Sequence, residues 1–267
     1  MKTILITGST DGIGKLVATR FATEGHQVYI HGRNSEKLAK VISEIKQISN
    51  SKNVDGFVAD FSDLQAVRLM AAEIRTKLST LDVLINNAGI FKSPVDRVHS
   101  GDIRFVVNYL APYLLTQEIL PILDATKNSR IINLSSAAQS EVSISALEGN
   151  AHLSVNESYA QSKLALTMWS FCLAKEHKDI TVIAVNPGSL LNTRMANEAY
   201  GQHWSPAEKG GDILYDLALS EAYSNDSGKY FDNDKGQVKG NFGPAHPDAY
   251  NEIKIKELIN KTNEILS

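Results

Sequence analysis

Short apolar runs alternate with longer amphipathic segments along most of the chain. The runs are rich in β-branched residues, and those reading ILI, VYI and VLI are apolar nearly throughout, as strands buried on both faces of a sheet should be. Such runs predict strands at Thr3–Thr7, Gln27–His31, Val54–Ala59, Leu81–Ile85, Arg130–Leu134, Thr181–Val185 and Lys229–Asp232.

Between these runs, apolar residues recur every three or four positions, which is the period of a helix buried along one face. Alternation of strands and helices is typical of a parallel sheet that carries helices on both faces. We therefore expect an α/β fold, a doubly wound seven-stranded parallel sheet. The predicted helices are Gly14–Glu24, Glu36–Ile48, Asp63–Leu78, Asp102–Leu123, Ser158–His177 and Ser205–Ser220, with a charged terminal helix from about Ala249 to Leu266.

The chain of 267 residues is long enough for one large domain or two small ones. Neither an internal repeat nor a low-complexity linker interrupts it, so we expect a single domain over 1–267. After Pro187 the pattern loosens. We interpret about 190–210 as a lid over a substrate site and about 227–267 as a C-terminal extension, because loops and chain ends commonly individualise such sites.

Composition and charge exclude several classes of protein. With 27 basic against 30 acidic residues and a net charge of −3, the chain has no basic block to follow a nucleic-acid backbone. The single cysteine, Cys172, excludes an intramolecular disulfide. No metal site is predicted, since the histidines form no His-Glu-x-x-His pair. Without a signal-peptide core or a run of ~18 apolar residues, we expect no membrane span and a cytoplasmic location.

The most informative segment is a glycine-rich turn between the first strand and the first helix. Gly8 permits a sharp exit from the strand, Gly12 lets the backbone approach a pyrophosphate, and Gly14 lets the helix pack closely. The helix N-terminus adds free N–H groups and a positive dipole end. An ordinary turn is the alternative; a Walker A loop is excluded because no Gly-Lys-Ser/Thr follows. The predicted dinucleotide contacts are Gly8, Ser9, Thr10, Asp11, Gly12, Ile13 and Gly14.

The end of the second strand indicates which dinucleotide is bound. A ribose 2′-hydroxyl is usually held there by Asp or Glu, whereas a 2′-phosphate requires a cation. Here the strand ends His31-Gly32-Arg33-Asn34, without a carboxylate. The guanidinium of Arg33 suits a phosphate in geometry and charge. NADP(H) is therefore preferred, NAD(H) remains possible, and a solvated surface arginine is the alternative.

Five motifs in order make the sequence resemble the short-chain dehydrogenase/reductase family. Its glycine signature is Thr-Gly-x-x-x-Gly-Ile-Gly, and the motifs together cover residues 3 to about 193. The resemblance implies a single-domain Rossmann fold. Gly228-Lys229-Tyr230-Phe231 is similar to the last strand of the retinol-dehydrogenase-like branch. The motifs after the glycine turn are Asn86-Asn87-Ala88-Gly89, Ser135-Ser136, Tyr159-Ala160-Gln161-Ser162-Lys163 and Pro187-Gly188.

Tyr159 and Lys163 are four residues apart and so share one face of a helix. A phenol with a pKa of ~10 is a poor base at neutral pH, but a nearby ammonium favours its ionised form. This pairing can turn a tyrosine into an acid–base catalyst. The resemblance implies that Tyr159 passes the proton to or from the substrate oxygen, while Lys163 lowers its pKa and binds the nicotinamide ribose.

The resemblance implies two further catalytic residues and the remaining cofactor contacts. Ser136 would donate a hydrogen bond to the substrate oxygen, with Ser135 as the alternative. Asn108 would hold a water next to Lys163, unless it only bonds its own helix backbone. The remaining implied contacts are Arg33, Asn34, Asp60 and Phe61 at the adenosine end, Asn87, Ala88 and Gly89 beneath the cofactor, and Tyr159, Lys163, Pro187, Gly188 and Thr193 around the nicotinamide.

We therefore expect an NADP(H)-dependent oxidoreductase that interconverts an alcohol and its carbonyl compound. A nicotinamide-binding regulator without turnover is one alternative, and a nucleotide-sugar epimerase or dehydratase is another. Apolar residues between Ser136 and Tyr159 and in the lid favour an apolar substrate, unless they pack on the protein itself.

The resemblance implies a homodimer or homotetramer that pairs through the helices carrying Asn108 and Tyr159. These helices carry more apolar residues than one buried face needs. The residues are Leu110, Leu114, Leu115, Leu164, Met168, Phe171 and Cys172.

Overall fold

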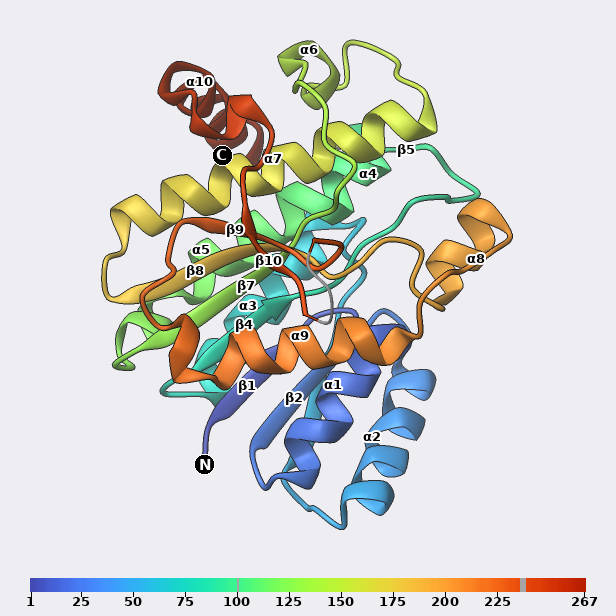
Figure 1. Ribbon diagram of the computed structural model, residues 1–267, viewed down its shortest axis with the longest axis vertical. Helices are drawn as coiled ribbons and strands as arrows, with labels where there is room; N and C mark the ends of the chain where they lie inside the picture. The colour runs from blue at the N-terminus through green and yellow to red at the C-terminus, as the bar shows by residue number, and fades with distance from the viewer. Residues whose placement is uncertain (100, 236–238) are drawn as a thin grey trace.

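The computed structural model describes residues 1–99, 101–235 and 239–267, and within them one large sheet lies between two layers of helices (Figure 1). The sheet has eight strands in the order β10-β9-β8-β7-β4-β1-β2-β3. Its strands are β1 (Thr3–Ile6), β2 (Gln27–Gly32), β3 (Val54–Val58), β4 (Val83–Asn86), β7 (Ser129–Leu134), β8 (Ile180–Asn186), β9 (Lys229–Asp232) and β10 (Asn241–Gly243), while β5 (Arg97–Val98) pairs with β6 (Gly101–Asp102) apart from it.

The predicted doubly wound sheet is confirmed. All seven predicted strands are present and pair in parallel from β3 to β9. The eighth strand, β10, was not predicted. It pairs antiparallel with β9 through only three residues of a glycine-rich segment, which is too short to show an alternating pattern. The predicted extension 227–267 includes 236–238, which lie outside the described residues.

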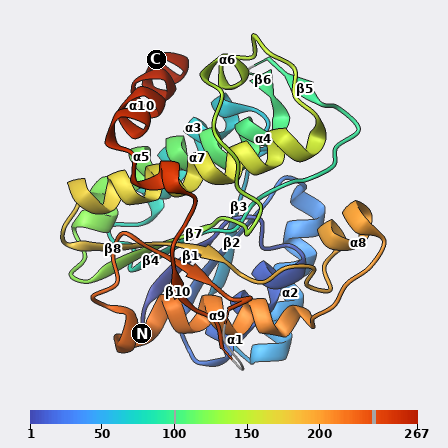
Figure 2. The same cartoon turned by 45° about the horizontal axis from the view of Figure 1, so that its top comes forward.

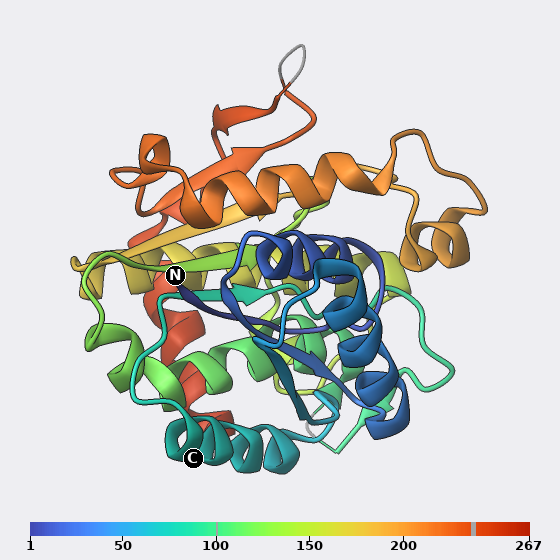
Figure 3. The ribbon, with the colours of Figure 1, turned by 90° about the horizontal axis from the view of Figure 1, so that it is seen from below.

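Helices cover both faces of the sheet, as Figure 3 shows edge-on. The apolar β1 strand explains why: Leu5 belongs to the core on one face, Ile4 and Ile6 belong to the core on the other, and all three are 0% exposed. The helices α1 (Gly12–Thr23), α2 (Ser35–Ser49) and α9 (Ala207–Leu219) lie on one face, and α3 (Leu64–Lys77), α5 (Ala111–Asp124) and α7 (Val155–Glu176) lie on the other.

The helix predicted at Asp102–Leu123 is interrupted. It consists of α4 (Ile103–Phe105), a π-helical turn η1 (Val106–Leu110) and α5. The π turn adds one residue to the helical repeat, and apolar periodicity cannot show this because every residue of the turn is buried. The shorter helical segments are α6 (Ile144–Leu147), α8 (Arg194–Tyr200), η2 (Glu221–Tyr223) and η3 (Pro247–Tyr250).

The last helix, α10 (Glu252–Leu266), packs against α7 (Figure 2) and is hydrogen-bonded to the π turn. Tyr109 lies 2.7 Å from Thr262, hydroxyl to hydroxyl, and the Tyr113 hydroxyl donates to Asn263 Oδ1 at 2.7 Å. No helix among the described residues is long and apolar enough to cross a membrane.

The apolar residues that suggested pairing through α5 and α7 are therefore not surplus, because they are covered within one chain. Leu110, Leu114, Leu115, Leu164, Met168 and Phe171 are at most 4% exposed. Cys172 is half-buried, and burial raises the pKa of its thiol to about 11, which does not suit a nucleophile. Pairing through these helices stays a prediction from the resemblance alone.

Candidate active site

A cleft of about 1310 Å³ follows the carboxyl ends of the parallel strands, where open α/β sheets bind ligands. Ser9, Gly14 and Asn108 are buried behind its wall and do not line it. The predicted residues that line it are Gly8, Thr10, Asp11, Gly12, Ile13, Arg33, Asn34, Asp60, Phe61, Asn87, Ala88, Gly89, Ser135, Ser136, Tyr159, Lys163, Pro187, Gly188 and Thr193.

The glycine turn fits closely against the loop after β4. A Cβ at Gly8 would lie 2.6 Å from the Ala88 Cα, and one at Gly14 would lie 2.5 Å from the Asn87 amide nitrogen. That nitrogen donates to the carbonyl oxygens of Thr7 and Gly8 at 2.8 and 2.9 Å. A larger residue at position 14 would therefore clash with Asn87, whose hydrogen bonds hold the turn in place.

Gly12 keeps the backbone of the turn open toward the cleft. Its φ is +53°, a conformation that favours glycine. A Cβ there would lie 3.7 Å from a methyl group of Thr193, so the loop after β8 reaches the turn. Thr193 also caps α8, because its side chain accepts from the Ala196 N–H at 3.3 Å.

His31, which was not predicted to belong to the site, fixes the glycine turn by a hydrogen bond to Gly8. The Gly8 N–H donates to His31 Nδ1 at 3.0 Å, so the ring proton must reside on Nε2, which lies 3.0 Å from the Ala59 carbonyl oxygen. The Phe61 ring stacks on the imidazole at 4.3 Å. Burial lowers the pKa of His31 to about 4. A lone histidine in an apolar strand gives no sequence signal for this role.

This buried imidazole predicts a pH dependence of stability. Between its ordinary pKa of 6.5 and about 4, the unfolded chain binds a proton that the folded chain does not, so the free energy of unfolding falls as pH decreases through that window. The expected loss is about 3 kcal/mol. Urea unfolding of His31→Gln should show a flatter pH profile than wild type. His152→Gln, at an exposed histidine, is the control, and equal slopes in His31→Gln and wild type would contradict the assignment.

Three cations gather at the end of the cleft near β2. Arg33, Lys37 and Lys40 all line it, and of these only Arg33 was predicted from the sequence. The Lys37 ammonium lies 3.0 Å from an Asp11 carboxylate oxygen. Asn34 begins α2, because its side-chain oxygen accepts from the Lys37 N–H at 2.8 Å. The Asn34 side-chain oxygen is therefore engaged in capping.

Lys163 lies beneath the predicted catalytic tyrosine. Its amine donates to the Leu134 carbonyl oxygen at 2.7 Å and lies 5.6 Å from the centre of the Tyr159 ring. Burial lowers the pKa of Lys163 to about 8, so the amine is still mainly protonated at neutral pH.

Helix α7 starts at Val155, before the predicted Ser158, because Ser154 and Glu157 form a capping box.

The two serines after β7 have different partners. The Ser135 hydroxyl donates to the Lys163 carbonyl oxygen at 3.1 Å and lies 2.7 Å from the Thr167 hydroxyl, so it ties the strand to α7. The Ser136 hydroxyl accepts from the Ala138 N–H at 3.1 Å and retains its own proton for donation. This difference favours Ser136 for contact with a substrate.

Asn108 lies at the centre of the π turn and joins two parts of the site. Its side chain accepts from the Ile90 N–H at 2.8 Å and donates to the Ile90 carbonyl and the Ser162 hydroxyl, each at 3.0 Å. A Cβ at Gly89 would lie 3.3 Å from Asn108 Oδ1 and 3.4 Å from the Lys163 amine. The Asn108 side chain thus bonds to Ile90 and Ser162 and not to the backbone of its own helix. That Asn108 holds a water next to Lys163 stays a prediction.

Asn233 and Asp234, which follow β9, bind the loop after β8. Neither residue was predicted to belong to the site. The Asn233 side chain donates to the Pro187 carbonyl oxygen at 2.8 Å, and Asp234 accepts from the Ser189 N–H at 2.9 Å. Further along this loop, Leu190 has a φ of +48° and accepts from the Trp204 N–H at 2.9 Å. These bonds fix the start of the segment that was predicted to be a lid; its role as a lid stays a prediction.

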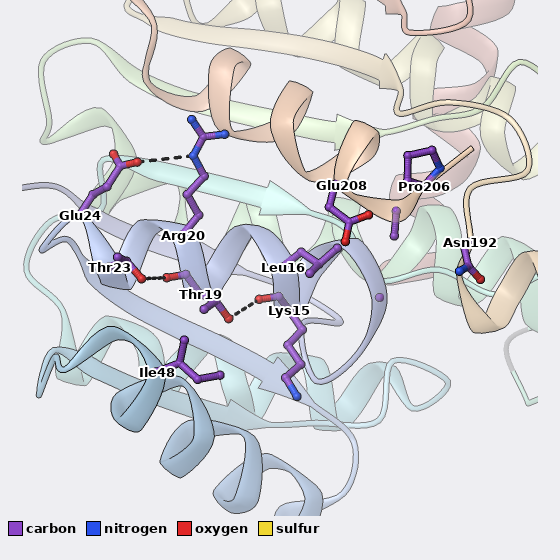
Figure 4. Close-up of a pocket in the computed structure, with 12 residues that line it drawn as sticks. Lys15, Leu16, Thr19, Arg20, Thr23, Glu24, Ile48, Asn192, Pro206 and Glu208 are labelled. Carbon is purple, nitrogen blue, oxygen red and sulfur yellow. Dashed lines mark hydrogen bonds and ion pairs between the residues drawn. The ribbon is translucent and has the colours of Figure 1, made fainter. Parts of the chain in front are cut away.

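A second hollow of about 710 Å³ lies on the outer side of α1 (Figure 4). Three of its four charged side chains are paired: Arg20 with Glu24 and Asp212, and Lys15 with Glu44. Of the residues predicted for the site it contains only Gly12. The cleft is therefore the candidate site. Within the described ranges, no three His, Cys, Asp or Glu residues gather closely enough to hold a metal ion.

This arrangement of sheet, glycine turn and Tyr-x-x-x-Lys helix matches a known family. The family model for short chain dehydrogenase matches residues 2–203. The chain belongs to this oxidoreductase family, in its retinol-dehydrogenase-like branch.

The curated relatives are similar over much of their length. Bovine retinol dehydrogenase 12 is 31% identical over 279 residues, which cover 99% of this chain and 86% of that protein. Human retinol dehydrogenase 13 is 31% identical, covering 96% and 82%. Human polyprenol dehydrogenase is 34% identical over 200 residues, covering 71% of this chain and 60% of that protein.

Solved structures share the fold. A protein from Mycobacterium paratuberculosis superposes with a TM-score of 0.79 at 22% identity and covers 99% of this chain and 93% of that one. A short chain dehydrogenase from Escherichia coli CFT073, solved with NADPH, has a TM-score of 0.71 at 26% identity and covers 86% and 95%.

Proposed function

We propose that the protein is an NADP(H)-dependent oxidoreductase that interconverts an alcohol and its carbonyl compound. The observation that carries the proposal is that Ser136, Tyr159 and Lys163 line the same cleft as the glycine turn and Arg33. The names of the relatives support it, because retinol and polyprenol are alcohols, and so does the NADPH in the Escherichia coli neighbour.

The residues of the cleft fit a dinucleotide. Gly12 leaves backbone exposed where a side chain would stand, the N-terminus of α1 faces the same place, and Arg33 and Lys37 supply positive charge at the adenosine end. Lys163 would bind the nicotinamide ribose. When bound, the cofactor would exchange a hydride with the substrate carbon.

The chain's own residues would manage the proton. In reduction, the Tyr159 hydroxyl would donate its proton to the substrate oxygen, and in oxidation the phenolate would take it back. The protonated amine of Lys163, 5.6 Å from the ring centre, favours the phenolate by its charge. Ser136 would donate a hydrogen bond to the same substrate oxygen and orient it.

The direct test is to follow NADPH absorbance with a panel of aldehydes and ketones, and NADP with alcohols. We expect turnover with at least one pair. Binding of NADPH without turnover across the panel would favour the regulator. A change of a nucleotide sugar with no net change in NADPH would favour the epimerase.

We propose further that the substrate is apolar and contacts Trp204. This side chain is 72% exposed although it lines the cleft, so a ligand could cover apolar surface that water now contacts. Trp204→Ala should raise KM for an apolar carbonyl substrate about tenfold and leave the Kd for NADPH unchanged.

Val95→Ala is the control for this substitution, because Val95 is 52% exposed but does not line the cleft. We expect its KM to match wild type. An unchanged KM in Trp204→Ala, measured with several apolar substrates, would contradict a contact between the substrate and Trp204.

A further inference from the structure

A buried arginine, Arg104, lies next to α7, the helix that carries Tyr159. The guanidinium of Arg104 is 1% exposed, although it carries a permanent charge. Its Nε donates to the Phe91 carbonyl oxygen at 3.0 Å, its Nη1 donates to both Asp102 carboxylate oxygens at 3.1 Å, and its Nη2 pairs with Asp96. The arginine thus fastens the loop after β4 to the start of α4.

The same carboxylate reaches the catalytic helix. Asp102 Oδ1 caps α4 by accepting from the Arg104 N–H at 2.8 Å, and Oδ2 accepts from the Ser158 hydroxyl at 2.8 Å. Ser158 is 0% exposed and immediately precedes Tyr159. The ion pair of Arg104 and Asp102 is therefore tied to α7 through the side chain of the residue next to the predicted acid–base group.

The network reaches the Tyr159 ring from the other side through Phe91. The Phe91 ring packs edge-on against the Tyr159 ring, with centres 4.9 Å apart and planes at 67°. Arg104 bonds the Phe91 carbonyl oxygen and so restrains the backbone that carries this ring. Arg104 is therefore linked to Tyr159 in two ways. One link runs through Asp102 and Ser158, the residue before Tyr159, and the other runs through Phe91.

From these contacts we infer that Arg104 and Asp102 are positioning residues that orient Tyr159 for proton transfer. The inference rests on the proposed function of Tyr159. A buried ion pair contributes little net stability compared with apolar residues of similar volume, so stability alone is a weak reason to place charges here. Catalytic geometry is a stronger reason, because an error of about 1 Å in position can lower a rate about a hundredfold.

The test compares two buried serines of α7. Ser158→Ala removes the bond to Asp102, whereas Ser170→Ala removes a serine that is also 0% exposed and accepts from Asn133 at 2.8 Å. We expect similar losses of Tm in both variants. Only Ser158→Ala should lose kcat, about tenfold, with KM for substrate and NADPH within about twofold of wild type. Equal kcat in the two variants would overturn the inference.

Arg104→Lys provides a second arm, since it keeps the charge but not the planar fork that serves Phe91 and Asp102 together. We expect folded Arg104→Lys to have a lower kcat than wild type at an unchanged KM. If Arg104→Lys does not fold, the serine pair still decides the question.

A spectroscopic readout separates this inference from the proposed function. In protein labelled with ¹³C-tyrosine, the Tyr159 signal is identified by its loss in Tyr159→Phe. We expect it to shift in Ser158→Ala and to stay in place in Ser170→Ala, whether or not a substrate is known. Full turnover of Tyr159→Phe would overturn the acid–base role, whereas an unmoved signal in Ser158→Ala would overturn the positioning role.

Discussion

Replacing Tyr159 with phenylalanine is expected to lower kcat by a factor of about 10² to 10⁴, the usual contribution of a positioned acid–base group. The substitution removes one hydroxyl from a ring that lines the cleft and packs against Phe91. The Kd for NADPH should change little, because the ring and Lys163 remain. The measurement is NADPH absorbance under saturating substrate, with cofactor binding followed by fluorescence titration.

Tyr113→Phe is the matched control. Its hydroxyl donates to Asn263 on α10, and the residue does not line the cleft. We expect kcat of this variant to equal that of wild type. Full turnover by Tyr159→Phe on a substrate that the wild type uses would remove the catalytic assignment.

The second large effect is expected on cofactor choice. Arg33→Ala should weaken NADPH binding about 10- to 100-fold, because a hydrogen bond to a charged group contributes about 1.5–3 kcal/mol. NADH, which lacks the 2′-phosphate, should bind equally well to both forms. Isothermal titration with each cofactor measures the difference, and added salt should reduce it.

Arg75→Ala controls for the loss of a positive charge, since Arg75 pairs with Glu118 away from the cleft. It should leave both affinities unchanged. Wild-type protein that binds NADH as tightly as NADPH would contradict the preference for NADP(H), whatever the catalytic result.

The parts of the fold that could be predicted from the sequence are those governed by local pattern. The run at Ile4 to Ile6 predicts a strand buried on both faces, and each neighbouring side chain does enter a different core. The π turn around Asn108 could not be predicted, because one extra residue in a fully buried helix leaves the apolar pattern intact. Strand β10 could not be predicted either, because its three residues form no alternating pattern and it is a strand only through its pairing with β9.

The candidate site was predictable to the extent that motifs lie at strand ends. Gly8, Ser136 and Pro187 follow parallel strands, whose carboxyl ends meet at one edge of the sheet. The supports behind them were not predictable. His31 bonds to Gly8 and Ala59, which are more than twenty residues away, whereas Arg104 bonds to Asp102, Asp96 and Phe91 within one loop. In neither case does a single histidine or arginine carry a motif that would indicate the role.

Helix α10 has a consequence for how the chain folds during synthesis. It follows every strand of the sheet in chain order, yet it covers Tyr109 on the π turn and packs along α7. The sheet and α7 are therefore synthesised before α10, so the apolar residues of α7 that α10 covers lack that cover until α10 docks. Intermediates of this kind are prone to aggregate. A chaperone that binds exposed apolar helices would find its target in this interval, before α10 docks.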